Sequence, residues 1–111
     1  MRATMESWKA EWPIVGDVRG LGPMLLVEFV ADRETKTPLS IPEVLAIVRH
    51  AAAHGVILMR AGLYSNCIRF LPPLNMPLDM MREALSVVGQ AIGSVSEQHA
   101  AQNQSELAGV R

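Results

Sequence analysis

A chain of 111 residues, half of them apolar, fits one globular domain with a modest core and leaves little room for a second. Its formal charge of -1 gives no field that attracts nucleic acid or an anionic membrane surface, so both are excluded as partners. Cys67 is the only cysteine, which rules out an intrachain disulfide and a Cys/His zinc cluster. We therefore expect a reducing, cytoplasmic setting. No apolar run approaches the ~18 residues that a membrane-spanning helix needs.

Residues 1–12 are expected to form a short helix. Met5, Trp8 and Trp12 recur at helical spacing, and Pro13 ends the pattern because the residue before a proline is pushed out of the helical region. So short a helix is marginal alone. We interpret the two tryptophans as packing residues that dock it onto the rest of the domain.

Two β-rich runs follow, over residues 14–30, on either side of Gly20 and Gly22. Glycine reaches positive φ without steric cost, so the pair predicts a tight reversal and a hairpin. The second run is apolar on both faces through Val27, which is typical of a central strand. Pro23 is tolerable only at the beginning of that strand, where it need not donate a hydrogen bond to the ladder.

After a charged surface loop at 31–38, a helix is expected from Ser40, as N-cap, to the C-terminal Gly55. Glu43 lies at the position that closes a capping box. His50 and His54, one turn apart, are interpreted as surface side chains rather than a metal pair, because no third ligand is near in the sequence. The apolar face predicted for this helix consists of Ile41, Leu45, Val48 and Ala52.

The second half of the chain predicts two strands and a long helix. Residues 56–59 are continuously apolar and are expected to form a strand covered on both faces, and residues 66–73 a second strand stopped by Pro72 and Pro73. Asn75 is a suitable cap for a helix that lies flat against the sheet. Residues 96–111 are polar and are expected to be a frayed tail, which leaves a single α+β domain over residues 1–95. The apolar repeat of the helix is Leu78, Met81, Leu85, Val88 and Ile92.

Arg69 is the candidate functional residue, because a charge within an otherwise apolar strand costs free energy unless it is paired or faces water. A guanidinium can grip a planar carboxylate through two parallel hydrogen bonds. The alternative is an arginine that points at solvent or pairs with Glu28 or Asp17, and the residues alone give both interpretations similar weight. Cys67 has no recognisable base beside it and is expected to be a buried, inert thiol.

Four segments together resemble the carboxy-terminal part of class III pyridoxal-phosphate-dependent aminotransferases. They are VGDVRGLGPM at 15–24, VEF at 27–29, GVIL at 55–58 and GLYSNCIRFLPPL at 62–74. Their order and spacing agree over roughly residues 10–95, and the 4-aminobutyrate and ω-aminotransferase group is the most similar.

The resemblance implies the small domain of a fold-type I enzyme: an antiparallel sheet of three to four strands with helices packed on one face. It implies that Arg69 anchors the substrate carboxylate and that Asn66 helps to shape the substrate site. Arg19 and Glu28 match recurrent positions that we treat as structural.

Comparison with the family also indicates that this sequence lacks the residues that bind the cofactor. In the family, the large domain supplies the lysine that binds pyridoxal phosphate, and neither Lys9 nor Lys36 lies in a matching pattern. We therefore expect no catalytic, cofactor-binding or metal-binding residue here, and no transaminase activity from this polypeptide alone. The first hypothesis is a detached domain or fragment that works with a large-domain partner chain. The others are a free-standing module that binds small carboxylates and a self-association module that forms dimers or other homo-oligomers.

Overall fold

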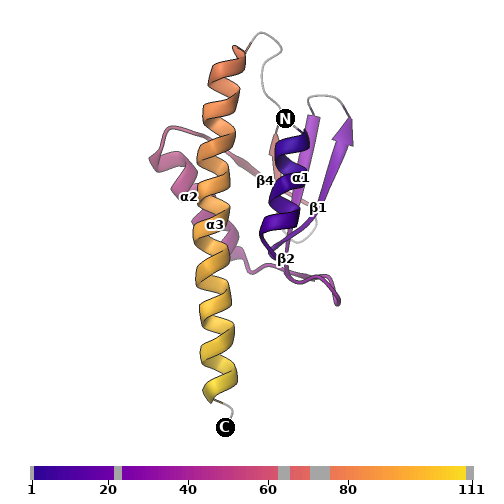
Figure 1. Ribbon diagram of the computed structural model, residues 1–111, viewed down its shortest axis with the longest axis vertical. Helices are drawn as coiled ribbons and strands as arrows, with labels where there is room; N and C mark the ends of the chain where they lie inside the picture. The colour runs from indigo at the N-terminus through magenta and orange to yellow at the C-terminus, as the bar shows by residue number, and fades with distance from the viewer. Residues whose placement is uncertain (1, 22–23, 63–65, 71–75, 110–111) are drawn as a thin grey trace.

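The computed structural model describes residues 2–21, 24–62, 66–70 and 76–109, and within them the strands form two groups that are separated by helices (Figure 1). In chain order they are α1 (Arg2–Glu11), β1 (Val15–Leu21), β2 (Met24–Asp32), β3 (Thr37–Pro38), α2 (Ile41–Ala53), β4 (Met59–Ala61), β5 (Cys67–Phe70) and α3 (Leu78–Gly109). The turn at Gly22 and Pro23, the prolines at 72 and 73 and the expected cap Asn75 lie outside the described residues.

The strands form one antiparallel sheet in the order β1-β2-β5-β4, and the short β3 pairs with β2. The expected hairpin and the central position of β2 are confirmed. Val18, Val27 and Ile68 are in register across three strands and are all buried, so this row faces the helices. The predicted α+β class, with a small antiparallel sheet and helices on one face, is confirmed. The loop expected at 31–38 is shorter than predicted, because β2 continues to Asp32 and β3 returns beside it.

Helix α1 docks on α3 through Trp8 and through Trp12, which directly follows the helix. Gly89 and Gly93, one turn apart on α3, lie against Trp8 and Trp12 respectively. A Cβ at Gly93 would come within 2.8 Å of the Trp12 ring, and one at Gly89 within 3.0 Å of the Trp8 indole nitrogen. The two glycines therefore form a notch that lets the indoles approach the α3 backbone.

Helix α2 begins as the sequence predicts. The Ser40 hydroxyl accepts a hydrogen bond from the Glu43 amide at 3.4 Å and donates to the Glu43 carboxylate at 2.7 Å. Gly55 follows the helix with a φ of 87°. The predicted apolar face is wrong by one position. A second stripe, one residue earlier along the helix, is also apolar in sequence, and only packing against the rest of the domain decides which of the two is buried. The buried residues are Val44, Ile47 and Ala51, whereas Ile41 is 48% exposed.

The strand expected at 56–59 needs correction. Strand β4 begins only at Met59 and lies at the edge of the sheet, where Ile57 is 81% exposed and Met59 66% exposed. A run of apolar residues predicts a strand but does not reveal whether its neighbours cover one face or two.

The frayed tail predicted after residue 95 is also corrected, because α3 continues to Gly109. Ser96 is buried, and His99 lies between two other elements: its Nδ1 is 2.6 Å from Glu43 Oε2 of α2 and its Nε2 is 3.3 Å from the Ala31 carbonyl oxygen of β2. These partners are 56 and 68 residues away, so local composition could not predict them.

We predict that Gly93→Ala destabilises the protein, although alanine favours a helix by about 1 kcal/mol over glycine. The added methyl group overlaps the Trp12 ring, and such overpacking costs about 1–3 kcal/mol. Urea unfolding should show a net loss of stability. Gln90→Ala, at an exposed position of the same helix, is the control and should change stability little. A gain of stability in Gly93→Ala would mean that the ring moves aside freely.

Candidate functional site

The sheet face turned away from the helices carries polar side chains, and we call it the open face. Side chains alternate along a strand, so neighbours of the buried row Val18, Val27 and Ile68 belong to this face. The register places them in two rows: Arg19, Leu26 and Arg69 in one, and Asp17, Glu28 and Cys67 in the other.

Arg69 projects from β5 between Leu26 on one neighbouring strand and Met59 on the other. It is exposed, and it lines a shallow hollow of about 230 Å³ together with Arg19, Gly20 and Leu26. Among the described residues no carboxylate forms an ion pair with its guanidinium. The Arg69 guanidinium therefore remains available to donate hydrogen bonds to a ligand in this hollow.

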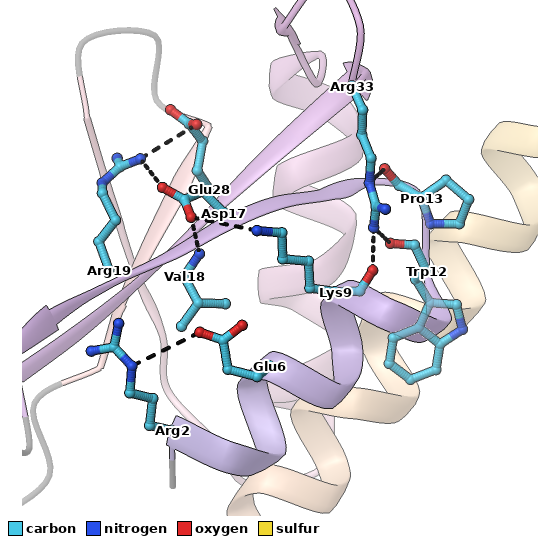
Figure 2. Close-up of polar contacts among 10 residues, drawn as sticks. All are labelled: Arg2, Glu6, Lys9, Trp12, Pro13, Asp17, Val18, Arg19, Glu28 and Arg33. Carbon is cyan, nitrogen blue, oxygen red and sulfur yellow. Dashed lines mark hydrogen bonds and ion pairs between the residues drawn. The ribbon is translucent and has the colours of Figure 1, made fainter.

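The carboxylates proposed as alternative partners of Arg69 pair with Arg19 instead (Figure 2). Arg19 Nη1 is 3.1 Å from Asp17 Oδ2 and 3.5 Å from Glu28 Oε2. The hydrogen bond with Asp17, and then the charge of Glu28, raise the pKa of the Arg19 guanidinium against the opposing effect of burial. The structure therefore contains no ion pair between Arg69 and either Glu28 or Asp17.

Two basic residues tie α1 to the sheet, and the role of Arg33 was not predicted (Figure 2). Lys9 Nζ lies 3.9 Å from Asp17 Oδ1. The Arg33 guanidinium donates to the carbonyl oxygens of Trp12, at 3.0 Å, of Pro13, at 3.2 Å, and of Lys9. Arginine favours the negative end of a helix dipole, so Arg33 closes the C-terminal end of α1. No sequence signal links residues 20 or more positions apart in this way.

Asn66 lies in the seam between β2 and β5 and not beside the Arg69 hollow. It is only 4% exposed, and its side-chain amide donates to the Phe29 carbonyl oxygen at 2.7 Å. The Phe29 amide in turn donates to the Asn66 carbonyl oxygen at 2.8 Å. These two bonds fasten the start of β5 to the centre of the sheet, so Asn66 positions the strand that carries Arg69.

We predict that Asn66→Ala lowers the free energy of unfolding by about 1–3 kcal/mol, because it removes a buried donor and leaves the Phe29 carbonyl with one bond fewer. Urea unfolding measures the loss, with Gln90→Ala as the matched removal of an exposed side-chain amide. Equal stability of the two variants would contradict a structural role for Asn66.

Cys67 is a buried free thiol beneath the open face, as expected. Its Sγ would lie 2.9 Å from a Cβ at Gly62, so glycine is required for this close approach. Burial is the largest cause that raises the pKa of the Cys67 thiol, and the nearby charge of Glu28 raises it further, although Arg19 opposes both. This arrangement favours the neutral thiol over the nucleophilic thiolate.

Cys67 should therefore react slowly with iodoacetamide at neutral pH, and its reaction should need a more alkaline medium than that of an unfolded cysteine. Since the thiol pKa is higher in the folded state, the thiolate favours unfolding, and this group lowers stability as the pH rises above its unfolded pKa. Mass spectrometry of the alkylated chain, native and in urea, measures both states. Equal rates at neutral pH would contradict the shielding.

The described part of the chain does not support a metal site or a membrane-spanning helix. It contains no group of three or more His, Cys, Asp or Glu residues that could hold a metal ion. The rings of His50 and His54 stack at 4.7 Å, and His54 Nδ1 lies 2.9 Å from the His50 carbonyl oxygen. No helix in the described segments is both long and apolar enough to cross a bilayer.

Comparison with known proteins gives consistent relatives. The chain is 40% identical over 81 residues to a probable 4-aminobutyrate aminotransferase of Bacillus subtilis, which covers 73% of this chain and 18% of that protein. It is 31% identical over 96 residues to a 5-aminovalerate aminotransferase of Pseudomonas aeruginosa, covering 86% and 22% respectively. No family model matches the chain.

Solved structures agree. A Bacillus anthracis aminotransferase superposes with a TM-score of 0.75 at 28% identity, over 84% of this chain and 22% of that one. An omega transaminase from Pseudomonas jessenii in complex with PMP shares the fold, with a TM-score of 0.78 at 23% identity over 89% of this chain and 21% of that one. The chain therefore spans about a fifth of the length of the proteins it matches.

Proposed function

Since the chain belongs to the class III pyridoxal-phosphate-dependent aminotransferases, as the counterpart of their small carboxy-terminal domain, we propose that Arg69 anchors a substrate carboxylate. The activity that it serves is amino-group transfer between an ω-amino acid or amine and a keto acid. That activity belongs to an enzyme completed by a large domain.

One observation carries the proposal: Arg69 is exposed on the open face, with a hollow beside it and its potential internal partners committed to Arg19. A guanidinium placed in this way offers two parallel donors to a planar carboxylate. The relatives named for 4-aminobutyrate and 5-aminovalerate act, by those names, on molecules that carry a carboxylate at one end and an amine at the other.

In this proposal, neither lysine of the chain holds pyridoxal phosphate. Lys9 lies on α1 beside Asp17, and Lys36 lies at the exposed turn between β2 and β3. Lys36 lines a hollow of about 380 Å³ with Asp17 and Glu28 and is exposed there, whereas a lysine that binds the cofactor needs a site that excludes water. In this proposal, the lysine that binds the cofactor and the groups that orient it come from the large domain, and this polypeptide alone does not catalyse transamination.

The proposal includes a partner and a compartment. The partner is a chain that carries the large domain, or a second copy of this chain in a homo-oligomer such as a dimer. Exposed Ile57 and Met59 support a covered surface here, since Met59 is directly opposite Arg69 in the sheet. A reducing, cytoplasmic setting fits the single buried thiol.

A second candidate is a free-standing module that binds small carboxylates or associates with itself. It needs only the exposed Arg69 and the apolar edge of the sheet, both of which the chain has without a large domain. The two candidates differ in whether the isolated chain retains a measurable affinity for a carboxylate.

Ligand-observed NMR tests the anchor, with 4-aminobutyrate as ligand and butylamine as the matched amine without a carboxylate. We expect weak binding of 4-aminobutyrate alone and a loss of about tenfold or more in Arg69→Gln, because hydrogen bonds to charged groups contribute about 1.5–3 kcal/mol. Arg60→Gln is the control, since Arg60 is an exposed arginine on the neighbouring strand. Equal binding by both variants would contradict the role of Arg69 as anchor. Transamination by the purified chain in the presence of pyridoxal phosphate would contradict the proposal that the chain needs a large domain.

A further inference from the structure

Glu28 lies between two arginines of the open face. In the register, Glu28 is opposite Cys67 on β5, two residues before Arg69, and opposite Asp17 on β1, two residues before Arg19. Diagonal neighbours of this kind have Cα atoms about 7–8 Å apart, within reach of long side chains. The strand register alone therefore gives Glu28 two possible partners, one on each neighbouring strand.

The structure resolves this choice in favour of Arg19. Glu28 Oε2 is 3.5 Å from Arg19 Nη1, and Asp17 holds the same Nη1 at 3.1 Å. Asp17 is itself fixed, because its Oδ1 accepts a hydrogen bond from the Val18 amide at 2.9 Å and lies 3.9 Å from Lys9 Nζ. Glu28 is thereby bound to Arg19, whereas no ion pair joins it to Arg69, although both arginines line the same hollow.

We propose that Arg19 is a positioning residue that keeps Glu28 away from Arg69 and so leaves Arg69 available to a ligand carboxylate. An internal carboxylate within reach of Arg69 competes with an external one for the same donors, and it does so at high effective concentration. Arg19 removes this competitor by binding it. The inference rests on the proposed function, because it concerns the availability of Arg69 for a carboxylate.

The central variant is Arg19→Gln, which releases Glu28. We expect the affinity for 4-aminobutyrate to fall by about two- to fivefold, the range expected from exposed ion pairs. Arg19→Lys keeps the positive charge and should retain most of the affinity. The double variant Arg19→Gln/Glu28→Gln should recover the affinity, because the competitor is gone although Arg19 is still absent. A purely structural role for Arg19 would not be rescued by the removal of Glu28.

A second measurement needs no ligand. The side-chain Nε–Hε resonance of Arg69 should shift in Arg19→Gln, when Glu28 turns to it, and should shift back in the double variant. Circular dichroism checks the fold of each variant. Arg19→Met, which keeps an unbranched apolar side chain, replaces Arg19→Gln if the latter unfolds.

The two measurements separate the inference from the function on which it rests. If wild type binds 4-aminobutyrate through Arg69 but Arg19→Gln changes neither affinity nor the Arg69 resonance, the positioning role of Arg19 is overturned and the anchor stands. If the Arg69 resonance responds as expected but wild type binds no carboxylate, the proposed function fails while the competition between Arg19 and Arg69 for Glu28 is supported.

Discussion

The alternation of side chains along the central strand β2 is the constraint on which the rest depends. Val27 faces the helices in a fully buried row, so its neighbours Leu26 and Glu28 must face the other way. A slip of one residue would exchange the two sets and expose the core. The burial of one face thereby fixes which polar groups meet on the other, and Arg69 is held on the open face because Ile68 is held in the core.

The helices contribute to the site indirectly, through the sheet. Trp8 and Trp12 fit against glycines of α3, and Arg33 closes the end of α1, so the orientation of α1 is fixed from two sides. This brings Lys9 to Asp17 and strengthens the charged cluster around Arg19. Packing among helices on one face therefore influences the electrostatics of the opposite face.

Local signals in the sequence predicted the helices and strands themselves better than they predicted which distant residues pack against them. The Ser40 cap, the hairpin and the short first helix follow from backbone preferences within a few residues, and they appear where expected. The exposed edge at Ile57 and the extension of α3 past residue 95 depend on distant partners and were missed. For the site, an apolar strand with one arginine singled out Arg69, whereas the capture of Glu28 by Arg19 and the burial of the Asn66 amide need the strand register.

Strand β4 has a consequence for the behaviour of the chain in solution. Its inner edge bonds to β5, and within the described residues no strand pairs with its outer edge, where backbone donors and acceptors can template another chain. The strand has only three residues, and Arg60 at its centre is exposed. Short length and a positive charge are the means by which natural sheets discourage the addition of foreign strands. The backbone of the edge nearest Arg69 is thus blunted against the addition of a foreign strand, whatever covers the exposed side chains of Ile57 and Met59.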